Sequence, residues 1–189
     1  MNNFTQHLEQ NVNWNKVFGV VDSLYNDKGF TSNADNFARA TMVEKAIDKF
    51  SNLDRVDQNG YDFLFNDKKV ELKMGKNLFY KRKDIKATKR FKVKSFLSET
   101  KTVEDFKQIS TYDYLLVIDL TARRVVVVDD NHARSLYTEG ADGAMIALKE
   151  GDYYECNLPE INVTLPPVNL STLYNQADQS FLNLSLIHI

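Results

Sequence analysis

The order of its elements assigns this 189-residue chain to the mixed α/β class. Two stretches with helical spacing of apolar residues come first, a hairpin of alternating apolar and charged residues follows, and two strongly apolar strands lie further on. This order predicts a mixed β-sheet flanked by helices. With 43% hydrophobic residues the chain can build one packed core, and we expect a single domain.

Two amphipathic helices are predicted near the N-terminus. Apolar residues recur at helical spacing over 14–25, and Gly29 is a typical stop signal for this first helix. A second helix follows the capping residues Ser32 and Asn33. Glu44 falls at the margin of its apolar arc, at about 100° per residue, and not on the opposite side.

A β-hairpin is predicted next, with strands over 60–65 and 69–73. Its turn is Asn66-Asp67, because these residue types tolerate the left-handed backbone of a tight hairpin. Side chains alternate along a strand, so the hairpin has two different faces. One face carries Tyr61, Phe63, Phe65, Val70 and Leu72, and the other carries Asp62, Leu64, Lys69, Glu71 and Lys73.

In this register Asp62 lies directly opposite Glu71, and Lys73 is on the same face. Two opposed carboxylates would repel by roughly 3 kcal/mol at an effective dielectric near 20, unless a cation lies between them. Magnesium suits such a pair, because it binds one or two protein carboxylates and completes its shell with water and phosphate. The simpler interpretation is a solvated strand face on which Lys73 forms a surface salt bridge.

The elements after the hairpin complete the α/β pattern. We expect a third strand over 91–97, a short helix over 102–110, a central apolar strand over 112–120 and a valine-rich strand over 124–128. No lysine or arginine follows Lys149, and all three prolines lie beyond it. We therefore expect residues 1–156 to form the core of the domain, and residues 157–189 to form a C-terminal segment that packs on this domain or on a partner.

Composition excludes several other classes. The apolar stretches fall short of the roughly 20 residues that a membrane span needs, and no leader of basic and then apolar residues is visible. Cys156 has no second cysteine to pair with, and the three histidines lack zinc-ligand spacing. We expect an intracellular, cytoplasmic protein without a membrane segment. The absence of a glycine-rich phosphate loop argues against a nucleotide cofactor.

Positive charge is concentrated in one segment of an otherwise acidic chain. Residues 81–94 hold eight basic residues and one acid, so they carry +7 and the rest of the chain carries −9. Such a cluster is suited to contacts with DNA phosphates, which position a duplex without reading its sequence. Arg123, Arg124 and Arg134 are weaker candidates. The predicted DNA-binding residues are Lys76, Lys81, Arg82, Lys83, Lys86, Lys89, Arg90, Lys92 and Lys94.

The hairpin residues resemble the PD-(D/E)XK nuclease superfamily, which has a restriction-endonuclease-like fold. The resemblance rests on Gly60-Tyr61-Asp62 and Val70-Glu71-Leu72-Lys73, and covers residues 35–130 as an order of elements. Tyr61 stands where the name of the motif has proline, a departure that many members share.

The resemblance implies roles for individual residues. Asp62 and Glu71 would bind the catalytic Mg²⁺, as one or two ions that Mn²⁺ can replace, and Lys73 would be catalytic. Glu44 matches the helical acid that assists in many members as a further metal or water ligand, and Asp48 is its substitute. The other interpretation of Glu44 is a partly buried acid that is solvated or paired with a lysine.

These features predict a magnesium-dependent endonuclease that hydrolyses phosphodiester bonds in double-stranded DNA. A restriction-type homodimer is the simplest form, because a chain this small can hardly hold two active sites. A Holliday-junction resolvase and a repair or phage nuclease are alternatives with the same chemistry. A non-catalytic DNA-binding module of the same fold is the alternative from another class.

Overall fold

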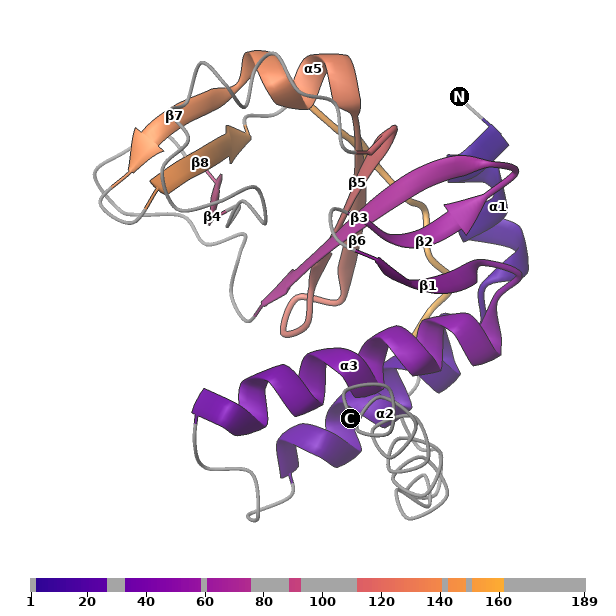
Figure 1. Cartoon of the computed structure of the whole chain (residues 1–189). Helices are drawn as coiled ribbons and strands as arrows, with labels where there is room; N and C mark the ends of the chain where they lie inside the picture. The colour runs from indigo at the N-terminus through magenta and orange to yellow at the C-terminus, as the bar shows by residue number, and fades with distance from the viewer. Residues whose placement is uncertain are drawn as a thin grey trace, which may run out of the picture. The chain divides into compact units, whose positions relative to one another are not determined.

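The structure is a computed structural model, shown in Figure 1. It describes residues 3–26, 33–58, 61–75, 89–92, 112–140, 143–148 and 151–161. The chain divides into two compact units. The first comprises Met1–Val12 and Ser51–Glu160, and the second comprises Asn13–Phe50 and Ile161–Ile189. Most of the predicted C-terminal segment 157–189 lies outside the described residues.

The second unit contains the two predicted amphipathic helices. They are α2 (Trp14–Asn26) and α3 (Asn33–Phe50), which lie side by side in Figure 1. The backbone N–H of Asn13 donates to the carbonyl of Phe50 at 2.9 Å, so the start of α2 is tied to the end of α3. Both helical predictions are confirmed. Their buried side chains include Trp14, Val17, Phe18, Val20, Val21, Leu24, Met42, Val43, Ala46 and Ile47.

The first unit is built on a six-stranded mixed sheet with the strand order β1-β2-β3-β5-β6-β9. Its strands are β1 (Asp54–Gln58), β2 (Tyr61–Phe65), β3 (Lys68–Gly75), β5 (Tyr114–Asp119), β6 (Arg124–Asp129) and β9 (Tyr154–Glu155). β3 and β5 pair in parallel, and the other neighbours pair antiparallel. The mixed α/β class predicted from the sequence is therefore observed.

The hairpin of β2 and β3 has the predicted turn, and its three paired positions have the predicted register, but the pairing ends at Phe63 and Val70 and does not extend to Asp62 and Glu71. Asn66 and Asp67 have φ angles of 48° and 63°, the left-handed conformation that a two-residue hairpin turn requires. Phe63 pairs with Val70, and Phe65 with Lys68. One difference concerns Tyr61, which was predicted to share the face of Phe63 and Val70. The Tyr61 ring packs instead against an apolar cluster that contains Leu115 and Val117, and the Lys69 ammonium lies 5.2 Å from the ring centroid.

Both faces of the sheet are covered within the first unit. α1 (Asn3–Asn11), which the sequence analysis did not predict, packs through the Phe4 ring against Phe65 and Tyr114, with centroid distances of 5.2 and 4.9 Å. The opposite face belongs to a second apolar cluster, which α5 (Asp130–Ser135) helps to cover. That cluster consists of Tyr112, Leu115, Val117, Val126, Val128, Ala133 and Leu148.

A three-stranded antiparallel sheet of order β4-β8-β7 accompanies the larger sheet. Its strands are β4 (Lys89–Lys92), β7 (Tyr137–Gly140) and β8 (Gly143–Leu148). The strand predicted over 91–97 overlaps β4 at two residues, and its remaining part lies outside the described residues, as does the helix predicted over 102–110. None of the helices in the described part of the chain has the length and apolar character needed to cross a lipid bilayer.

Candidate active site

Asp62 lies opposite an irregular stretch of the neighbouring strand β1. Arg55 pairs with Phe63 and Gln58 pairs with Tyr61, so the two residues Val56 and Asp57 stand opposite the single residue Asp62. The extra residue of this β-bulge belongs to β1, and bulges bend a strand and are common beside active sites. Asp62 is therefore the residue of β2 that faces the bulge.

The β3 side of Asp62 is irregular as well. The backbone N–H of Leu72 donates to Oδ2 of Asp62 at 2.6 Å, where a continued antiparallel ladder would use a main-chain carbonyl. The Asp62 carboxylate thus reaches across to β3 and binds the residue that follows Glu71 in the sequence. This bond holds Asp62 against the strand that carries the other two predicted residues, Glu71 and Lys73.

Glu71 is buried, on the face of the hairpin that was predicted to carry charge, and this differs from the simpler interpretation of a solvated strand face. It pairs in parallel with Leu115, and Lys73 pairs with Val117, so these acidic and basic side chains share a face with the second apolar cluster. Glu71 is only 3% exposed. The interpretation as a surface salt bridge requires an exposed pair, and the structure does not provide one.

The Lys73 ammonium contacts Oε1 of Glu71 directly. The side chains are 20% and 4% exposed, so this is a largely buried ion pair. Burial raises the pKa of the Asp62 carboxyl, while the Leu72 N–H and the charges of Lys73 and Arg55 oppose that rise. Lys73 therefore contacts Glu71, and its charge also favours the ionised form of Asp62. A buried ion pair is a poor source of stability, because desolvation consumes most of its Coulomb energy.

Asp62 and Glu71 supply carboxylate oxygens from two neighbouring strands. Mg²⁺ binds oxygen ligands, and one or two protein carboxylates suffice when water and phosphate complete its shell. Asp62 and Glu71 fit that requirement. The part of the chain that the structure describes contains no group of three or more His, Cys, Asp or Glu side chains arranged to hold a metal. A site here would consequently depend on the substrate for further ligands.

Glu44 lies on α3 in the second unit. It is half-buried beside Val43 and Met42, at the margin of the apolar arc where the sequence places it. Asp48, its substitute, is exposed. Because Asp62 and Glu71 belong to the first unit, participation of Glu44 at their site stays a prediction.

Three of the predicted DNA-binding residues lie on β4, at an edge of the three-stranded sheet. These are Lys89, Arg90 and Lys92. The other six, Lys76, Lys81, Arg82, Lys83, Lys86 and Lys94, lie outside the described residues. Among the weaker candidates, Arg124 forms an ion pair with Glu155, and Arg134 pairs with Asp130 at 3.0 Å.

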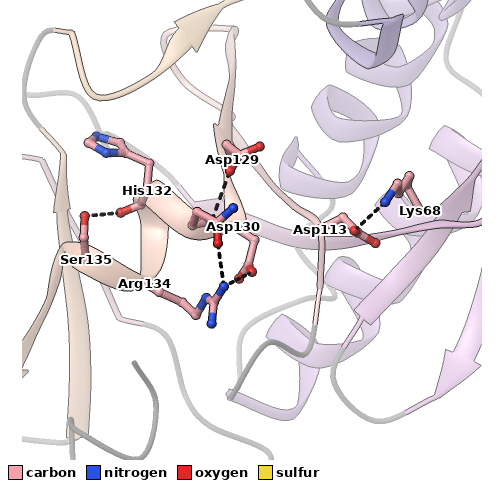
Figure 2. Close-up of polar contacts among 8 residues, drawn as sticks. Lys68, Asp113, Asp129, Asp130, His132, Arg134 and Ser135 are labelled. Atoms are coloured by element: carbon pink, nitrogen blue, oxygen red, sulfur yellow. Dashed lines mark hydrogen bonds and ion pairs between the residues drawn. The ribbon is translucent and has the colours of Figure 1, made fainter. Parts of the chain in front are cut away.

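The polar groups in Figure 2 have structural functions and provide a contrast with the candidate site. Asp113 accepts from the Lys69 backbone N–H at 2.8 Å and pairs with the exposed Lys68 ammonium at 3.1 Å, which joins the starts of β3 and β5. Asp129 caps α5 by accepting from the Asn131 N–H at 3.0 Å. Each of these carboxylates binds a backbone N–H at the end of an element.

Sequence reasoning missed the contribution of β1. The segment Asp54-Arg55-Val56-Asp57-Gln58 has one apolar residue, so no alternating pattern indicated a strand. As a result neither the bulge nor the charge of Arg55 on Asp62 was expected. Val56 is the one apolar residue of β1, and this is too weak a signal to predict the bulge or the effect of Arg55 on Asp62.

Comparisons with known proteins give no further guidance: no protein-family model, curated protein or solved structure matches the chain.

Proposed function

We propose that the chain is a magnesium-dependent DNA endonuclease of the restriction-endonuclease-like fold, acting on double-stranded DNA. The observation that carries the proposal is the placement of three residues on two adjacent strands. Asp62 accepts a hydrogen bond from the backbone of β3, and Glu71 is buried on that strand in contact with Lys73. A folded chain rarely buries an acid such as Glu71 without an ion-pair partner, a metal or a catalytic use for it.

Each residue has a defined role in this proposal. Asp62 and Glu71 would hold the Mg²⁺, which stabilises the charge of the phosphoryl group and activates water when it is bound. Lys73 would donate hydrogen bonds to the attacking water or to a phosphate oxygen. The hydrogen bond from the Leu72 N–H orients the Asp62 side chain toward β3. Glu44 is the residue that we assign to assist them.

The basic residues supply DNA contacts in this proposal. β4 lies in the same unit as the carboxylates and carries Lys89, Arg90 and Lys92. Each phosphate contact contributes a slope of about −0.9 to the dependence of log affinity on log salt concentration. A triple substitution of these residues by glutamine should reduce the magnitude of that slope by up to about 3. Loss of affinity without a change of slope would contradict phosphate contact.

Plasmid cleavage tests the proposal. The purified protein is incubated with supercoiled plasmid and Mg²⁺ or Mn²⁺, alongside Asp62→Asn, Glu71→Gln and Lys73→Met. We expect cleavage by the unmodified protein and a loss of at least about a hundredfold in each variant, the size typical of removing one group that stabilises the transition state. Asp113→Asn, an exposed carboxylate of the same unit, is the matched control and should cleave normally.

The substrate in the same assay separates related activities. A linear duplex and a four-way junction of the same sequence should be cut differently by a restriction-type enzyme and a junction resolvase, because only the latter prefers the branched DNA. A protein that binds DNA equally with and without Mg²⁺ and never cuts it would instead be a binding module. Gel filtration coupled to light scattering tests the proposed homodimer.

A further inference from the structure

Lys73 is the ion-pair partner of the buried Glu71 carboxylate. Its ammonium contacts Oε1 of Glu71, and its charge also acts on the Asp62 carboxylate. A lysine ammonium is a compact point charge on a flexible stem, so it can serve as a counter-ion and can also move away. Glu71 is 3% exposed and has little access to solvent cations from the bulk. The ammonium therefore supplies its charge compensation within the fold.

A divalent cation bound by Asp62 and Glu71 would occupy the same electrostatic position. Two cations at that short range repel strongly where water is largely excluded. The ammonium and the metal thus compete for the Glu71 carboxylate. This competition follows from the ion pair on β3 and from the burial that keeps solvent away from it.

We propose that Lys73 is the resident counter-ion of Glu71, and that a divalent cation held by Asp62 and Glu71 binds only by displacing its ammonium. The inference rests on the proposed function, since it takes these two acids to be the metal site. Displacement releases the Lys73 ammonium from Glu71. Metal binding and the availability of the lysine are then one event, and the lysine is withheld from the substrate until the metal has entered.

Metal affinity without DNA tests the inference. Mn²⁺ binding is measured by electron paramagnetic resonance of the free ion for the unmodified protein, Lys73→Met, Lys73→Arg and Glu71→Gln. We expect Lys73→Met to bind Mn²⁺ at least tenfold more tightly, Lys73→Arg to bind within a few-fold of the unmodified protein, and Glu71→Gln to bind much more weakly. Lys68→Met removes an exposed ammonium from the same strand and should change the affinity less than twofold.

A second measurement uses the unmodified protein and is independent of whether a variant folds. Acetylation of individual lysines is followed by mass spectrometry with and without Mn²⁺. Displacement predicts that Lys73 becomes more reactive when the metal binds, whereas Lys68 keeps its reactivity. Unchanged or lower reactivity of Lys73, or equal affinity of Lys73→Met, overturns the inference even if Mg²⁺-dependent cleavage is observed. Absence of Mn²⁺ binding in every variant overturns it together with the proposed function.

Discussion

Neutralising Lys73 should destabilise the metal-free protein much more than removal of a surface charge. Lys73→Met removes the ammonium that contacts the buried Glu71 carboxylate. Removing one member of a buried pair typically lowers the free energy of unfolding by about 3–5 kcal/mol, and we expect the lower end because the Lys73 side chain is 20% exposed. Glu71→Gln in the same chain removes the uncompensated charge, so the double variant should recover most of the loss.

Urea denaturation in the presence of a chelator measures this effect. The four proteins of the Lys73–Glu71 cycle give a coupling energy, which we expect to be about 2 kcal/mol. The matched cycle of Lys68→Met and Asp113→Asn probes a solvent-exposed pair, with side chains 56% and 36% exposed, and its coupling should be several times smaller. Equal coupling in both cycles would refute the claim that Glu71 and Lys73 form a desolvated charged site.

Three further outcomes are expected. Asp62→Asn keeps an acceptor for the Leu72 N–H and removes a carboxylate whose pKa is raised by burial. Because the folded state holds that proton more tightly than the unfolded chain, metal-free stability falls as the pH rises above about 3.8. The variant should therefore melt at a higher temperature than the unmodified protein at neutral pH. Burial against Phe65 lowers the pKa of His7 below 6.5, so the contribution of His7 to stability is present above that pH and is lost as the pH falls below it. His7→Phe should therefore flatten the pH dependence of the melting temperature between about pH 5 and 7, and an unchanged pH dependence would contradict the assignment. Burial raises the pKa of the Cys156 thiol to about 12, so a disulfide reagent near neutral pH should label the folded protein far more slowly than the protein in guanidinium, and comparable rates would show the thiol to be accessible.

The hairpin was predictable because its determinants are local. Asn66 and Asp67 select a two-residue turn, and that turn sets which residues of the strands face each other. The apolar run that forms β5 likewise predicted a central strand, since only strands covered on both faces are apolar at successive positions. These parts of the fold and site depend on neighbours within a few residues.

The rest depends on residues that are distant in sequence. Glu71 pairs with Leu115, about forty residues later in the chain, so the alternation within the hairpin predicted its face but not its burial. β1 and α1 contain too few apolar residues to give a periodic signal. The relation of Glu44 to Asp62 involves both units, and no pattern within either segment determines it.

The same division between near and distant contacts has a consequence for folding kinetics. Asp62 and Leu72 lie on one hairpin, and hairpins form in about 1–10 μs, so the acids can meet early. The parallel pairing of β3 with β5 must close a much longer loop and is intrinsically slower. Early in folding the pair would therefore be hydrated and would bind divalent ions as weakly as any two surface acids. In the proposed metal site the dry environment would form later, and metal selectivity would form with it.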